Sequence, residues 1–234
     1  MKEDLAIIVF PDAPLFSITE EIAFPSMNTD FSSILYQAMY LNHLEFFKEN
    51  NVAGRFYFLL YESDRNNITE TFKEFFGTVL PVFLHNPGDS AELHNYIAKI
   101  GEKFSSMLIF RSNSLGLSRS LLDSYINMLE MDNNVLLLSH SSSEHVVAYG
   151  LNHFDSELKL EFGTKQVLFT ECLKKVSVLD RFLFVSKELH SLNTMEDFRA
   201  LYSLLSQKEN YNLCSLRVHD MLTDVFIEYR EILK

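Results

Sequence analysis

The chain has 234 residues, of which 47% are hydrophobic, and its formal net charge is -12. This is enough to bury a sizeable core, either as one large α/β domain or as one domain with a helical appendage, and the second is favoured. The negative charge argues against a nucleic-acid partner, because that affinity depends on Lys and Arg that neutralise phosphates. A small phosphate ligand is not excluded, since it needs only a few amides, cations or a metal.

No apolar run approaches the length that spans a bilayer, and the acidic segment 1–4 leads directly into a strand-like run. A cytoplasmic protein with no membrane partner is therefore predicted. The two cysteines, Cys172 and Cys214, are far apart and lie in helical patterns. Two buried, reduced thiols are predicted here, in preference to a disulfide or a metal pair.

The first half of the chain alternates apolar runs, which indicate buried strands, with amphipathic stretches, which indicate helices. The predicted strands cover 5–10, 55–61, 79–84 and 107–111. The predicted helices cover 31–50 (capped by Asp30), 68–76 (ended by Gly77), 90–104 and a stretch after Leu117. A long loop over 11–28 follows the first strand.

The second half continues this alternation. Strands over 134–138 and 146–151 are predicted to form a hairpin around the polar loop 139–145, and a last strand covers 181–185. Helices are predicted over 164–175, 195–206 and 215–233. The pattern predicts a mainly parallel sheet with helices on both faces. The apolar side of the last helix either packs on the domain, which is favoured, or offers a surface for a homodimer or a protein partner.

The stretch 107–117 is the centre of this pattern. A short apolar run breaks into Arg111, Ser112, Asn113 and Ser114, and an amphipathic helix follows. Ligands of open α/β sheets bind where strands end at their carboxyl edge. Residues 111–114 therefore mark the place where chemistry is expected.

Several short motifs occur in a characteristic order along the chain. They are Ala13-Pro14 after the first strand, Gly88-Asp89 before a helix, Ser112 with Gly116-Leu117, Gly150-Leu151 after a hairpin, 163–168, and Ser191–Asp197 as a near match to Asp-x-Asp-Thr-Pro-Glu-Asp. In this order the sequence resembles the bacterial GT-A-like glycosyltransferase family found beside radical SAM and selenoprotein domains, which is related to nucleotide-diphospho-sugar transferases and molybdenum-cofactor-type nucleotidyltransferases. The resemblance covers about 5–205. It implies a GT-A-like α/β domain over 1–207 with a C-terminal helical extension over 208–234.

The same resemblance implies a nucleotide-sugar ligand whose diphosphate is neutralised by Mg²⁺ or Mn²⁺ on carboxylates. The family motif Ser-Asp-x-Pro-Gly-Leu appears here over 112–117. Ser112, Gly116 and Leu117 match it, but Asn113 stands in place of the aspartate. Asn113 supplies at best a neutral carbonyl oxygen.

The loop after the first strand departs from the family in the same direction. The family pattern is Lys-Ala-Pro-x-x-Gly-x-x-Lys-Thr-Arg, whereas this chain has Asp12 for the leading Lys, Ser17 for the Gly, and Glu20 and Ile22 for the later cations. Such a loop repels a diphosphate. If Asp12, Glu20 or Glu21 folds over the carboxyl ends of the strands, a diphosphate has no place to bind.

Two further motifs have changed. The family's Glu-Asp-Gly-Gly aligns with 142–145, so that Ser143 replaces the Asp while Glu144 and His145 replace the glycines. In the segment 191–197, Asn193 is neutral where the family has its second carboxylate. Thr194 is still expected to cap the following helix. The structural residues of these motifs have been retained more than the chemical ones.

The favoured prediction is a diverged transferase-like protein that lacks metal-dependent catalysis and acts as a binding or scaffold protein. No resident metal is predicted, and a nucleotide or nucleotide sugar is the candidate ligand. The alternative is an active glycosyl- or nucleotidyltransferase with an altered, metal-independent site around Arg111, Asn113 and 139–145. Arg111 either grips an anionic ligand or, as is favoured, pairs with a carboxylate such as Asp89 or Glu144. His140, Glu144 and His145 are either a metal or acid-base group or, as is favoured, a solvated loop. The vestigial site positions are Asp12, Ser17, Arg111, Ser112, Asn113, Ser143, Glu144, His145 and Asn193.

Overall fold

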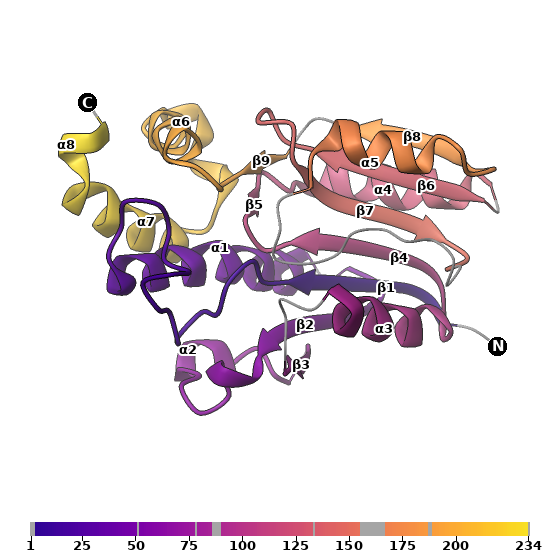
Figure 1. Cartoon of the computed structure of the whole chain (residues 1–234), viewed down its shortest axis with the longest axis horizontal. Helices are drawn as coiled ribbons and strands as arrows, with labels where there is room; N and C mark the ends of the chain where they lie inside the picture. Colours follow the sequence, from indigo (N-terminus) through magenta and orange to yellow (C-terminus); the bar gives the residue numbers. More distant parts are fainter. Residues whose placement is uncertain are drawn as a thin grey trace.

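The computed structural model describes residues 3–50, 52–77, 79–85, 90–132, 134–154, 167–186 and 189–233. Its centre is a seven-stranded sheet in the order β3-β2-β1-β4-β7-β6-β8, with helices on both faces (Figure 1). Every neighbouring pair is parallel except those of β7, which runs antiparallel to β4 and to β6. The predicted mainly parallel sheet and hairpin are confirmed. The strands are β1 (Glu3–Phe10), β2 (Arg55–Tyr61), β3 (Leu80–Leu84), β4 (Phe104–Arg111), β6 (Val135–His140), β7 (Val146–Asn152) and β8 (Phe182–Ser186).

Most of the predicted helices are confirmed, but α2 is shorter than the predicted 68–76 and α5 begins later than the predicted 164, of which 164–166 lie outside the described residues. They are α1 (Thr29–Asn50), α2 (Glu70–Lys73), α3 (Ser90–Gly101), α4 (Arg119–Glu130), α5 (Phe169–Val176), α6 (Met195–Leu205), α7 (Leu216–Glu228) and α8 (Arg230–Leu233), with 3-10 segments η1 (Glu62–Asp64) and η2 (Lys208–Leu213). The predicted helix 215–233 is in fact two helices that meet at Tyr229. The predicted helix 90–104 ends at Gly101, because Phe104 already belongs to β4.

The start of α1 corrects one prediction. The backbone N–H of Phe31 donates to the Asn28 side-chain oxygen at 2.9 Å, so Asn28 caps the helix. Asp30, the predicted cap, lies inside the first turn, where the positive end of the helix dipole stabilises its negative charge.

The period of two along each strand divides the core into two layers. In β1, Ile7 and Val9 face the layer formed with α1, α4, α6 and α7, whereas Ala6 and Ile8 face the layer formed with α3 and α5. Both sets are fully buried. The run of apolar residues that predicted this strand is explained by the cover on both faces.

The C-terminal helix α7 packs on α1, as predicted. Its side chains Val218, Leu222 and Val225 are fully buried and belong to the same core as the central strands. On its outer side, Leu216 and Ile227 remain exposed. The division into 1–207 and 208–234 stays a prediction.

Neither cysteine forms a disulfide. Cys172 is buried, but Cys214 is only half-buried, contrary to the prediction. Burial and the nearby Glu45 charge raise the pKa of the Cys214 thiol to about 11. Within the described ranges, no helix has the length and apolarity needed to cross a membrane.

The strand order reverses at β1 and β4, whose carboxyl ends lie side by side. From β1 the chain moves outward through β2 to β3 and then returns to the other side of β1 as β4. Such a switch point opens a crevice in doubly wound sheets. Beyond the end of β4 lies a short antiparallel ribbon of β5 (Ser114–Leu115) and β9 (His190–Ser191) (Figure 1).

Candidate functional site

A buried ion pair lies at the carboxyl ends of β1 and β4. Phe10 and Arg111 are register partners, so Asp12 is brought back beside the end of β4. Arg111 donates from Nη2 to Asp12 Oδ1, and the Asn113 backbone N–H donates to Asp12 Oδ2 at 3.3 Å. Arg111 is 2% exposed. The expected pairing of Arg111 with a carboxylate is confirmed, but the sequence did not indicate Asp12 as the partner, and Asp89 lies outside the described residues.

The charges in this pair compensate each other. Burial raises the pKa of Asp12, while the Arg111 guanidinium and the Asn113 amide act against that rise. The Arg111 guanidinium also lies 5.4 Å from the centre of the Phe10 ring. Because the pair is desolvated, its two partners depend on each other far more than a surface pair does.

The turn after β4 joins two of the altered motifs. The Ser112 N–H donates to the Phe10 carbonyl at 2.9 Å, and the Asp12 N–H donates to Ser112 Oγ at 3.3 Å. The Asn113 side-chain amide donates to Asn193 Oδ1. Asn113 is buried, and its own Oδ1 has no hydrogen-bond partner within the part of the chain that the structure describes. At Gly116 φ is 94°, which explains why the glycine of this motif is retained.

The hairpin loop 141–145 contacts the segment that leads to Asn193. Ser143 Oγ and Ser191 Oγ are 2.9 Å apart, and His145 Nδ1 lies 3.3 Å from Ser143 Oγ. Burial lowers the pKa of His145, and the charges of Asp197 and Arg111 also act on this ring. The predicted positions that the structure brings together are therefore Asp12, Arg111, Ser112, Asn113, Ser143, His145 and Asn193.

Ser17 belongs to a neighbouring cluster around Asp64, which the sequence did not reveal. The Ser17 N–H donates to Asp64 Oδ1 at 3.1 Å, and Ser17 Oγ donates to the Ser63 carbonyl at 2.9 Å. Burial raises the pKa of Asp64, and its backbone hydrogen bonds oppose that rise. Asp12 and Asp64 both raise the pKa of Tyr61, after the larger effect of burial, so both lie near the end of β2. The one feature of the sequence that could have indicated this cluster is the position of Asp64, an acidic residue shortly after a predicted strand.

The reading of 140–145 as a solvated loop is only partly correct. Ser142 and Glu144 are exposed. His140, by contrast, is buried at the end of β6 and stacks on Phe169 with ring centres 4.2 Å apart. Its Nδ1 lies 3.9 Å from Glu144 Oε1. Among the residues that the structure describes, no group of three His, Cys, Asp or Glu side chains is arranged to hold a metal ion.

Glu144 has a φ of 60° at a position where the family motif has a glycine. A β-branched residue is disfavoured there, whereas Asn tolerates this conformation. Glu144→Val is expected to lower the free energy of unfolding by about 1–2 kcal/mol, and Glu144→Asn to leave it unchanged or higher. Urea denaturation measures both. Glu144→Gln removes the charge alone and serves as the control; equal stability of the Val and Asn variants would contradict the expectation.

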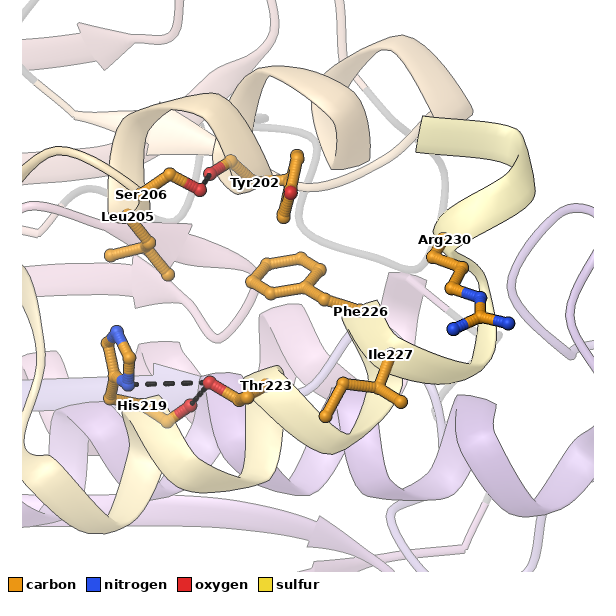
Figure 2. A pocket seen from close by; sticks show the side chains of 8 residues that line it. All are labelled: Tyr202, Leu205, Ser206, His219, Thr223, Phe226, Ile227 and Arg230. Carbon is orange, nitrogen blue, oxygen red and sulfur yellow. Dashed lines mark hydrogen bonds between the residues drawn. The ribbon is translucent and has the colours of Figure 1, made fainter. Parts of the chain in front are cut away.

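Two cavities lie near the C-terminal helices. One of about 240 Å³ lies beside the β5–β9 ribbon and is lined by Ser142, His190, Ser191, Asp197 and apolar side chains of α1, α6 and the ribbon. The other, of about 400 Å³, lies between α6 and α7 (Figure 2). In Figure 2, Phe226 projects between the two helices toward Tyr202, and Thr223 is hydrogen-bonded to His219. Neither cavity contains the Asp12 and Arg111 pair in its lining.

No protein-family model matches the chain, and no curated protein sequence matches it significantly. Solved structures do resemble it. A protein of Desulfovibrio desulfuricans G20, provisionally assigned as a nucleotide-diphospho-sugar transferase, matches with a TM-score of 0.71 at 10% identity over 99% of this chain and 97% of its own. The similarity thus includes the C-terminal helices, which the sequence resemblance left out.

Two cytidylyltransferase structures are also similar. The inositol-1-phosphate CTP transferase of T. maritima matches with a TM-score of 0.52 at 10% identity, over 97% of each chain. The 4-diphosphocytidyl-2C-methyl-D-erythritol synthase of Anaerococcus prevotii DSM 20548 matches with a TM-score of 0.53 at 13% identity, over 88% of this chain and 97% of its own. At these identities the similarity concerns the fold. The chain therefore has the α/β fold of nucleotide-diphospho-sugar transferase-like and cytidylyltransferase structures.

Proposed function

We propose that the chain is a diverged nucleotide-diphospho-sugar transferase-like protein that lacks metal-dependent transfer and acts as a binding or scaffold protein. The observation that carries this proposal is the buried Asp12 and Arg111 ion pair at the carboxyl ends of β1 and β4. It meets the condition set by the sequence, that an acidic residue of the first loop folds over these strand ends. A cytoplasmic setting, which the apolar and charge pattern of the sequence favours, and the link to the family found beside radical SAM domains, which the sequence resemblance favours, are part of the same proposal.

The ion pair removes the charge that a diphosphate would need. A diphosphate is held by cations, by a metal or by free backbone amides. At this edge the Arg111 guanidinium is buried and its charge is already compensated by Asp12. The following loop adds the exposed carboxylates of Glu20 and Glu21. An incoming diphosphate would meet neutral or negative side chains.

The same residues do not fit the Mg²⁺ or Mn²⁺ that the resemblance implies. Both oxygens of Asp12 already accept hydrogen bonds. The other two motif positions, Asn113 and Asn193, are neutral amides bound to each other. Hard divalent cations prefer several carboxylate oxygens, and this donor set does not offer them.

The strand ends still carry neutral hydrogen-bonding groups. Asn113 Oδ1 is a buried acceptor with no hydrogen-bond partner among the described residues, and the Ser143 hydroxyl lies within hydrogen-bond distance of Ser191 and of His145. Because an unpaired buried acceptor costs free energy, a ligand donor that reaches Asn113 would be stabilised. A nucleotide or nucleotide sugar held here would be bound through its base or hydroxyl groups and not through metal-bridged phosphates.

Calorimetric titration of the wild-type chain tests the proposal. UDP- and GDP-sugars and CTP are added with and without Mn²⁺. The proposal predicts no metal-dependent binding. Micromolar binding that requires Mn²⁺ would contradict the proposed function. Product formation without added metal would establish the alternative of an active, metal-independent transferase.

A further inference from the structure

Three consecutive backbone amides in the loop after β1 converge on one buried carboxylate. The N–H of Leu15 donates to Asp64 Oδ2 at 2.8 Å. The N–H groups of Phe16 and Ser17 donate to Asp64 Oδ1 at 2.9 and 3.1 Å. Successive amides that point to one centre form an anion-binding nest of the kind that holds phosphates in other folds.

The loop is held in this conformation by contacts that do not involve Asp64. The Leu15 carbonyl accepts hydrogen bonds from Ser33 Oγ and from Gln37 Nε2, both on α1. Ser17 Oγ donates to the Ser63 carbonyl. Leu15 is itself buried at 1% exposure, and Phe16 packs edge-on against the Phe72 ring. The three N–H groups are therefore expected to keep their direction when the carboxylate is removed.

The occupant of the nest belongs to the chain itself. Asp64 has no exposed surface, and it lies in η1, directly after β2. The backbone groups that contact its two oxygens are all donors, which suits an ionised carboxylate. The nest lies near the carboxyl ends of β1 and β2, because residues 15–17 follow the end of β1 closely and Asp64 follows the end of β2.

We propose that Asp64 is a tethered anion that fills a phosphate-type nest formed by residues 15–17, and that this nest accepts a free oxyanion only when the carboxylate is absent or displaced. This inference rests on the proposed function in one respect: both concern the loss of phosphate binding in the loop after β1, and the inference names Asp64 as the group that keeps a phosphate out of that loop. The nest itself follows from the hydrogen bonds. The ligand class is a small tetrahedral oxyanion or the terminal phosphate of a larger molecule.

Thermal denaturation of variants in inorganic phosphate tests this inference, with chloride at matched ionic strength as the reference. Asp64→Ala and Asp64→Ser vacate the nest, whereas Asp64→Asn fills it with a neutral group of the same shape. The first two are expected to have a lower Tm than wild type in chloride and to regain Tm with phosphate in a saturable way, as expected for a ligand of the folded state. Wild type and Asp64→Asn should show only the response common to both salts. Asp123→Ala, which removes an exposed carboxylate that pairs with Arg119, controls for the change in net charge.

Each outcome of this experiment decides the question. If Asp64→Ala is unfolded in chloride, the inference predicts that phosphate restores the fold, and a chain that stays unfolded would count against it. No phosphate-specific gain in either vacating variant, or an equal gain in Asp64→Asn, overturns it. Amide resonances of Leu15, Phe16 and Ser17 should shift on addition of phosphate to a vacated variant, and shifts confined to other residues would also overturn it. Metal-dependent binding of a nucleotide sugar by wild type would end the proposed function and leave this result unchanged.

Discussion

Replacing Arg111 with Met is expected to lower the free energy of unfolding by about 3–5 kcal/mol, because it leaves the Asp12 carboxylate desolvated without its cation. The guanidinium side chain is 3% exposed and that of Asp12 is 12% exposed, so water cannot readily replace the lost partner. Urea denaturation at pH 7 measures the loss. The double variant Asp12→Asn with Arg111→Met should recover a large part of it, since no unpaired charge then remains.

An exposed pair on α4 provides the matched control for this prediction. Arg119 and Asp123 are 2.9 Å apart, but both side chains are about half exposed. Arg119→Met should therefore cost no more than about 1 kcal/mol. If Arg111→Met lowers the free energy of unfolding as little as Arg119→Met does, the Asp12 and Arg111 pair does not behave as a buried ion pair.

The stability of the fold is expected to fall by about 3 kcal/mol as the pH decreases from 6.5 to 4, through the single side chain of His43. His43 is 1% exposed on α1, and burial lowers its pKa to about 4. In this pH range the unfolded chain binds the proton and the folded chain does not, so acid favours unfolding. The contribution is fully present above pH 6.5 and is lost as the pH approaches 4.

The surroundings of His43 explain why it stays neutral. Its Nε2 lies 3.2 Å from Ser114 Oγ, and that hydroxyl already donates to the Arg111 carbonyl, so Nε2 is the donor to Ser114. Its Nδ1 is buried with no hydrogen-bond partner in the described structure. His43→Gln keeps an N–H donor and removes the titration. Its urea midpoint should vary less between pH 7 and pH 4 than that of wild type, and an equal variation would show that His43 is not responsible.

The fold followed from the sequence because local pattern and position in the sheet agree. Ile7 and Val9 alternate with Ala6 and Ile8 on a strand covered on both faces, which makes an apolar run a reliable signal. The sequence also placed Asp12 and Arg111 at strand ends, and the structure brings these two ends to one edge of the sheet. Their contact was not indicated, because it depends on β4 lying beside β1. The pairing of β4 with β1 is a property of the sheet topology, and the local pattern of the residues between the two strands does not indicate it.

Asp64 shows the other limit of sequence reasoning. Its partners are backbone amides of Leu15, Phe16 and Ser17. Every non-proline residue has such an amide, so no residue type marks the nest. His140 was misread for a similar reason: its polar neighbours indicated a solvated loop, but the ring is buried against Phe169, which comes from a segment nearly thirty residues away by the numbering.

The most direct test of the central claim is an electron paramagnetic resonance titration of Mn²⁺ in the presence of UDP or CDP. Wild type is compared with the double variant Asn113→Asp, Asn193→Asp, which restores carboxylates at two motif positions. The account predicts that the Mn²⁺ signal of a solution that contains the nucleotide does not change when the wild-type chain is added. A wild-type chain that depletes this signal in proportion to its concentration would contradict the account.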